Sequence, residues 1–262
     1  MFQLKGVRKE YSAFFERHRL WIATSTLVGT TIGAGILGIP YVVARAGVVY
    51  GLFVIVLLGL AFMFLNLALG EVVLRTKGIH QLSGYAEKYL GMPGKVIMSM
   101  VLMINIYGAL SAYVIGEGIA LHSLFSGIPQ IVFSVLFFMA GVAVVLHGLR
   151  ATGRLELLLI ALLVIVVIVM GIFSLSLFNI FSFSVFDFST PWLSLFLPWG
   201  VILFAFMGAP AIPEMREELG SRLKLMKQAI IIGTVIPLLV YLLFTIIVVG
   251  IVGVDRMIML GP

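Results

Sequence analysis

The segment from Gly29 to Pro40, Gly-Thr-Thr-Ile-Gly-Ala-Gly-Ile-Leu-Gly-Ile-Pro, places four glycines and a proline inside an apolar run long enough to cross a bilayer. Glycine and proline both weaken a helix interior. Because hydrocarbon offers no water to freed backbone groups, a break at membrane depth is tolerated only where protein surrounds it or a cavity adjoins it. We therefore expect an interrupted helix here, with bare N–H groups on one side of the break and bare C=O groups on the other.

The composition predicts an all-α polytopic membrane protein. Of the 262 residues, 62% are hydrophobic and only 11% are charged, whereas soluble domains carry about 25% charged residues. The chain has no cysteine, which excludes a disulfide framework and a thiolate metal site. Seven apolar runs each have the roughly 20 residues that a bilayer crossing needs. The predicted crossings are residues 20–44, 48–74, 95–122, 128–148, 155–178, 192–213 and 226–253.

The basic residues predict the orientation of the chain. If residues 1–19 form a cytoplasmic tail, the cytoplasmic side receives every lysine and arginine except Arg45 and Arg256. Such an excess follows the positive-inside rule, and it predicts a multi-pass protein of the cell membrane with a cytoplasmic amino terminus. The net charge of +6 is then explained by topology and by contact with anionic headgroups. We expect the lipid bilayer as a partner and no nucleic acid, and the sequence sets no oligomeric state.

A second interruption lies in the sixth predicted crossing, where Gly208, Pro210 and Pro213 fall within six residues. The motif Gly-x-x-x-Ile-Pro occurs in both interruptions, beginning once at Gly35 and once at Gly208. The second interruption lies five crossings after the first. Because five is odd, the two halves of the chain run through the membrane in opposite directions, which is typical of an inverted repeat.

This symmetry divides the chain into a first five-helix repeat over residues 20–178 and the start of a second repeat over residues 192–262. The second repeat contains two of the five expected crossings. We therefore expect either that the sequence is a fragment or that a partner chain supplies the remaining crossings.

The two interruptions predict a binding site for a small zwitterion. Bare N–H groups at the positive end of a half-helix suit a carboxylate, and freed carbonyls suit an ammonium group. The predicted N–H donors are Gly33, Ala34, Gly35 and Ile36; the predicted carbonyl side consists of Thr30, Thr31, Ile32, Phe204, Ala205 and Phe206, with Met207 and Gly208 beside them. A different interpretation of Gly29-x-x-x-Gly33 is a close-packing face between helices, and both interpretations can hold together.

The third predicted crossing offers further candidates. Tyr107 and Ser111 share one helix face at a spacing of four residues, and that face either lines the substrate cavity or makes a helix–helix hydrogen bond. Glu117 is an acidic residue within the same crossing, and intramembrane carboxylates are functional candidates. Its distance along the helix from Lys95 is about 33 Å at a rise of ~1.5 Å per residue, so an outer or structural role competes with gating or proton coupling.

Residues 29–41, which continue the opening segment through Tyr41, resemble the first span of the amino acid permeases of the amino acid/polyamine/organocation superfamily. Residues 204–214, followed by Glu217-Glu218-Leu219, are similar to the sixth span of the amino acid/auxin and aromatic amino acid permease branch. The resemblance implies the LeuT-type inverted-repeat fold with discontinuous helices 1 and 6, alternating access, and symport driven by H⁺ or Na⁺. It also implies that Gly33, Ala34 and Gly35 bind the substrate carboxylate.

The expected function is therefore secondary active transport of a neutral, hydrophobic or aromatic amino acid, with no enzymatic activity and no cofactor. The alternative is a seven-span receptor or another non-transport membrane protein. A receptor would place its amino terminus outside, against the charge distribution, and a retinal protein needs a lysine in its last span, where residues 229–253 have none. An intramembrane enzyme needs paired His, Asp or Glu side chains at depth, and the predicted crossings offer no such pair.

Overall fold

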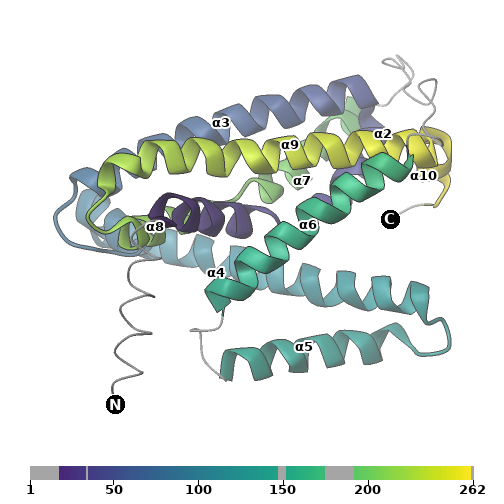
Figure 1. Ribbon diagram of the computed structural model, residues 1–262, viewed down its shortest axis with the longest axis horizontal. Coiled ribbons are helices and arrows are strands. Elements are labelled where there is room, and N and C mark those ends of the chain that lie inside the picture. Colours follow the sequence, from purple (N-terminus) through teal and green to yellow (C-terminus); the bar gives the residue numbers. More distant parts are fainter. Residues whose placement is uncertain (1–17, 34, 147–151, 175–191, 261–262) are drawn as a thin grey trace. The chain divides into compact units, whose positions relative to one another are not determined.

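The computed structural model describes residues 18–33, 35–146, 152–174 and 192–260. These residues form helices joined by short connections, and no strand occurs among them (Figure 1). After a first helix, His18–Thr31, the elements are α2 (Gly35–Ala46), α3 (Val48–Arg75), α4 (Leu82–Leu124), α5 (Gln130–Leu146), α6 (Thr152–Ser174), η3 (Trp192–Phe196), α7 (Leu197–Ala205), α8 (Ala211–Leu219), η4 (Leu223–Leu225), α9 (Met226–Val252) and α10 (Val254–Leu260).

The class of helical membrane protein is confirmed. By length and composition, three stretches of the described chain can each cross a membrane: Val48–Arg75, Leu82–Leu124 and Leu223–Val252. The bent pair His18–Thr31 and Gly35–Ala46 counts as a fourth crossing if the two helices form one span. Shorter apolar helices cover Gln130–Leu146, Ala161–Phe173 and Ser194–Ala205, so the number of seven crossings stays a prediction.

The described residues form two compact units, one made of the chain up to Ile79 and from Glu156 onward, the other of His80–Leu155. These units differ from the predicted repeats, so the repeat boundaries stay predictions. The predicted tail, residues 1–19, lies outside the described residues up to residue 17.

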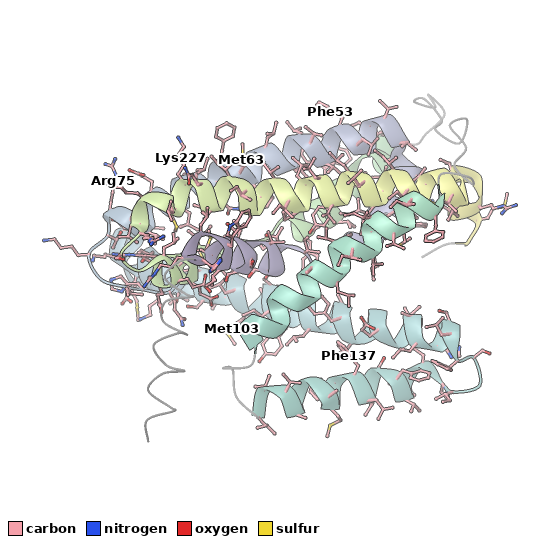
Figure 2. The ribbon with its side chains drawn as sticks, viewed as in Figure 1. Phe53, Met63, Arg75, Met103, Phe137 and Lys227 are labelled. Atoms are coloured by element: carbon pink, nitrogen blue, oxygen red, sulfur yellow. The ribbon has the colours of Figure 1, made fainter. Side chains whose placement is uncertain are left out.

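The first unit is built around α3 and α9, which lie side by side and run in opposite directions (Figure 1). Arg75 at the end of α3 and Lys227 at the start of α9 lie at the same end of this pair (Figure 2). Two glycines of α3 let the helices approach: a methyl group added at Gly59 would lie 2.8 Å from a Leu238 methyl, and one at Gly70 would lie 2.6 Å from that of Ile230. Small residues at a helix contact are the usual means of close packing in membranes.

The hydrophobic core of this unit combines α2, α3, α7 and α9. Ile39, Ile55, Ile202 and Tyr241 have no exposed surface, and Val43 and Val249 also contribute fully buried side chains. The outward face of α3 exposes large apolar side chains instead, including Phe53, labelled in Figure 2, and Phe64. Such a face is suited to lipid, because contiguous exposed apolar surface is rare on soluble proteins.

The second unit is a pair of helices, α4 and α5. Gly91 has φ 71° and divides α4 by a kink, a backbone conformation that favours glycine. Farther along, α4 packs against α5 at Gly118, where an added methyl group would clash with the Ser134 side chain. The Ser134 hydroxyl donates a hydrogen bond to the carbonyl of Val114 at 2.9 Å.

Arg216 of α8 binds the end of α3 within the first unit. Its Nη1 donates to the carbonyls of Val73 at 2.7 Å, Thr76 at 3.1 Å and Gly78 at 2.6 Å. The last carbonyls of a helix have no intrahelical partner, and the negative end of the helix dipole favours a cation there. Arg216 therefore acts as a C-terminal cap supplied from a distant part of the chain.

Replacing Arg216 by Gln should lower the free energy of unfolding by about 1.5–3 kcal/mol, the range for hydrogen bonds that involve a charged group. Thermal unfolding of the purified protein in detergent measures this loss. Lys224→Gln is the matched control, because Lys224 is exposed on η4 and its loss should leave the midpoint within about a degree. Equal midpoints for the two variants would contradict the capping role.

Candidate functional site at the two helix breaks

The first interruption lies between Thr31, where the first helix ends, and Gly35, where α2 begins, and the two helix axes differ by 55°. It is shorter than the glycine-rich segment that predicted it, because Pro40 lies inside α2. There the missing proline N–H leaves the carbonyl of Ile36 without its usual helical donor. The break therefore includes Ile32 and Gly33, the second of which is a predicted N–H donor; Ala34 lies outside the described residues.

Two backbone bonds shape this break. The N–H of Ile32 donates to the Val28 carbonyl at 2.8 Å, and the N–H of Ile36 donates to the Gly33 carbonyl at 3.2 Å. Ile36, one of the predicted carboxylate donors, thus uses its N–H within the turn. The Thr30 and Thr31 hydroxyls donate back along their own helix, each at 2.7 Å, to residues four positions earlier.

The second interruption separates α7, which ends at Ala205, from α8, which begins at Ala211. The N–H of Met207 donates to the Phe204 carbonyl at 3.2 Å, and the N–H of Gly208 donates to the Phe206 carbonyl at 2.8 Å. These two carbonyls, predicted to receive an ammonium group, therefore already accept one bond each. A carbonyl has two lone pairs, so their role in binding a ligand stays a prediction.

The two interruptions meet. A methyl group added at Gly35 would lie 2.8 Å from Cβ and 2.9 Å from Cα of Ala205. Gly208 lies equally close to the first helix, because a methyl group there would come within 2.5 Å of the Thr31 hydroxyl. The absence of a side chain at Gly35 lets α2 approach the backbone of α7, and its absence at Gly208 makes room for the Thr31 side chain. The close-packing and ligand-binding interpretations of the glycines are therefore compatible at this point.

Tyr241 of α9 connects the two interruptions, and sequence reasoning missed it. Its hydroxyl lies 2.8 Å from the carbonyl of Thr31 and 2.8 Å from the carbonyl of Ala205. Tyr241 has no exposed surface. It is also the sole tyrosine between Met226 and Val252, and a buried tyrosine in an apolar helix needs a hydrogen-bond partner, which is the signal that could have found it.

Phe206 belongs to the core of the first unit. Its ring meets that of Tyr241 edge-on, with centroids 5.1 Å apart, and stacks on Phe62 with centroids 6.0 Å apart. Phe206 is only 1% exposed, whereas Phe204 and Met207 are half-buried. Of the aromatic residues predicted around the second break, Phe204 therefore has the side chain with surface left for a ligand.

Tyr107, Ser111 and Glu117 lie on α4 in the second unit, and all three are exposed there. The Ser111 hydroxyl donates to the backbone carbonyl of Tyr107 within the same helix, at 2.9 Å. Their contribution to the site stays a prediction. No group of three His, Cys, Asp or Glu residues suited to hold a metal ion occurs in the described part of the chain.

The first helix is also joined to α8. The Thr26 hydroxyl donates to a Glu218 carboxylate oxygen at 2.8 Å, and the Arg19 guanidinium donates to the Glu218 carbonyl at 3.2 Å. Glu214 lies on the exposed side of α8, beyond the apolar part of the sixth predicted crossing. Partial desolvation and the neighbouring Glu217 carboxylate raise the pKa of its carboxyl group. Polar contacts thus join the first helix to α8, which are the half-helices on the other side of the two breaks from α2 and α7.

Comparison with known protein families identifies the family of this chain. The model of the tryptophan/tyrosine permease family matches residues 16–260. The chain belongs to this family. The family is described as one of permeases for tryptophan and tyrosine, and such a family implies no cofactor.

Named relatives agree with this assignment. Over 229 residues the chain is 24% identical to tyrosine-specific transport system 1 of Haemophilus influenzae, and the match covers 85% of this chain and 55% of that protein. System 2 of the same organism is 35% identical over 104 residues, 39% of this chain and 25% of the relative. Glutamine transporter 2 of Aliivibrio fischeri is 26% identical over 240 residues, which are 88% of this chain and 61% of that protein.

Two of these relatives, tyrosine-specific transport system 1 and glutamine transporter 2, match most of this chain. The chain spans about half of their length. No solved structure matches it.

The close approach of Gly35 to Ala205 predicts a strong effect of one methyl group. Gly35→Ala should lower the unfolding free energy by about 1–3 kcal/mol, the usual cost of overpacking, because backbone atoms of α7 would have to move. Thermal unfolding in detergent measures the change. Gly200→Ala in α7 is the control, since a methyl group there meets no atom within 4 Å.

Adding Ala205→Gly to Gly35→Ala should restore part of the loss, because it removes the Ala205 methyl group and leaves only the backbone of α7 in the way of the new side chain. A Gly35→Ala protein as stable as the Gly200→Ala control would show that the two breaks do not pack as described.

Proposed function

We propose that this permease is a secondary active transporter that moves a neutral, hydrophobic or aromatic amino acid across the cell membrane by alternating access. The observation that supports this most is the meeting of two interrupted helices at Gly35 and Ala205. Broken helices in contact provide a place where a polar ligand can bind peptide groups within an apolar protein. The names of two relatives, which are tyrosine-specific systems, favour an aromatic substrate.

A zwitterion suits the polarity of the half-helices. The amino-terminal end of α2 carries a partial positive charge, and the carboxyl-terminal ends of the first helix and of α7 carry partial negative charges. In this proposal the substrate carboxylate binds near Gly33 and Gly35, and its ammonium group binds on the carbonyl side of the breaks. A helix end contributes about 0.3–2 kcal/mol to such an interaction, so direct hydrogen bonds and the side-chain pocket supply the remaining affinity.

The proposed architecture is the LeuT-type inverted repeat with a cytoplasmic amino terminus. The repeated Gly-x-x-x-Ile-Pro motif supports the repeat, and the positions of Arg75 and Lys227 at one end of the α3–α9 pair support a common cytoplasmic end (Figure 2). Rocking of one repeat against the other would then expose the site to each side in turn, driven by symport of H⁺ or Na⁺.

Uptake of radiolabelled L-tyrosine, L-tryptophan and L-glutamine, by cells expressing the protein as the organism makes it, tests this function. We expect one of the aromatic amino acids to accumulate and an imposed H⁺ or Na⁺ gradient to drive it. Gly33→Val should reduce uptake at least 10-fold while surface expression persists, because the valine side chain fills the space in which the carboxylate approaches the backbone. Gly200→Val, in open space on α7, should retain uptake. Normal uptake by Gly33→Val would refute the site.

Glu117 provides a separate test of coupling. If its carboxyl group carries the coupled proton, Glu117→Gln should flatten the pH dependence of uptake, because glutamine does not titrate. The measurement is the initial rate of uptake between pH 5 and 8. The exposed Glu87, which pairs with Lys95 at 2.8 Å, supplies the control Glu87→Gln on the same helix. A pH profile that matches the unmodified protein would reject proton coupling by Glu117 and leave Na⁺ as the ion to test.

A further inference from the structure

Tyr241 brings three oxygen atoms together with one proton among them. The hydroxyl lies 2.8 Å from both the Thr31 carbonyl and the Ala205 carbonyl, yet a tyrosine hydroxyl can donate only one hydrogen. We propose that Tyr241 is a positioning residue for transport, whose hydroxyl shares its proton between the two carbonyls and so holds the two broken helices at the spacing that substrate binding requires. This inference rests on the proposed function, because it assigns Tyr241 to the ammonium side of that same site.

The two carbonyls belong to helix ends of the same polarity. Thr31 ends the first helix and Ala205 ends α7, so both present the negative end of a helix dipole. Two such ends repel each other when no donor lies between them. The Tyr241 hydroxyl is a donor placed between them, and it comes from a third helix, α9, that contains neither break.

Packing fixes the direction in which the hydroxyl points. Tyr241 is fully buried, and its ring meets Phe206 edge-on. Phe206 in turn stacks on Phe62 of α3 and lies against the position where Gly59 lacks a side chain. These ring contacts orient the Tyr241 side chain, so the position of its hydroxyl depends on α3, α7 and α9 together.

The sharing of one proton has a consequence for the ligand. Each carbonyl receives less than one full hydrogen bond from Tyr241, and each retains lone-pair capacity. An ammonium group brings three donors and would complete the bonding of these oxygens. Tyr241 therefore fixes where the acceptors lie, while the substrate supplies the positive charge that they lack.

Tyr241→Phe in the protein as the organism makes it tests the inference, because it removes the hydroxyl and keeps the ring contact with Phe206. We expect the KM for L-tyrosine, or for whichever amino acid of the uptake panel is transported fastest, to rise about 10-fold. That factor corresponds to the net strength of about one hydrogen bond. The maximal rate per transporter at the surface should stay within about 2-fold. A loss of folded protein would lower the total uptake rate and leave KM unchanged, so a rise in KM distinguishes the positioning role from a loss of stability.

Tyr50→Phe is the matched control. The Tyr50 hydroxyl also joins separate elements, donating to the Leu195 carbonyl at 3.1 Å and accepting from Trp199 Nε1 at 2.9 Å. It lies near the start of α3, and both of these partners precede the second break in the sequence. We expect Tyr50→Phe to affect thermal stability about as much as Tyr241→Phe does and to leave KM unchanged.

A des-amino analogue separates the two ends of the substrate. Competition by 3-(4-hydroxyphenyl)propionate, which keeps the carboxylate and lacks the ammonium group, should weaken no more than 2-fold in Tyr241→Phe, because Tyr241 acts on the ammonium side. An equal loss for analogue and amino acid would overturn this assignment.

If Tyr241→Phe fails to reach the membrane, 3-fluorotyrosine at position 241 replaces it. Fluorine keeps the shape of the ring and makes the hydroxyl a stronger donor, so KM should fall. An unchanged KM in the variant that reaches the membrane overturns the role of Tyr241 and leaves the transport function standing. Absence of amino acid uptake by the unmodified protein overturns the function and this inference with it.

Discussion

The structure depends on how backbone groups are satisfied where two helices stop inside an apolar protein. At the first break the Thr31 carbonyl, and at the second the Ala205 carbonyl, have no following helical turn to supply a donor. The hydroxyl of Tyr241 lies within 2.8 Å of both. An unsatisfied carbonyl in such surroundings costs about 1–3 kcal/mol, so the placement of α9 beside both breaks stabilises the fold.

Close approach of the helices accompanies this arrangement. α9 can reach the breaks because Gly59 and Gly70 of α3 and Gly233 of α9 remove side chains from the contacts on either side. A methyl group at Gly233, for example, would come within 2.8 Å of Leu27 on the first helix. Gly35 then lets α2 contact Ala205 directly. The glycines thus serve packing, and the same packing leaves peptide groups of both breaks near one another.

Away from the breaks, charged side chains of α8 bind neighbouring helices. Arg216 caps α3, and Glu218 accepts a hydrogen bond from Thr26. Both residues belong to α8, which begins at the end of the predicted sixth crossing. α8 is therefore held to α3 and to the first helix by charged side chains, whereas the hydrogen bonds of α7 described above, at Trp199 and Ala205, join neutral groups. This difference suits a helix whose two halves face different surroundings, one toward headgroups and one toward hydrocarbon.

The sequence by itself determined the helical membrane class, the place of both interruptions and the family. Long apolar runs and Gly-Pro motifs are local features, and local chemistry in hydrocarbon leaves few alternatives to a helix or a protected break. Only the tertiary structure decided that Pro40 continues α2, that Phe206 enters the core, and that Tyr241 lies between the Thr31 and Ala205 carbonyls. These outcomes depend on which helices pack together, and a contact between residues 210 positions apart has no signal in the local pattern of either segment.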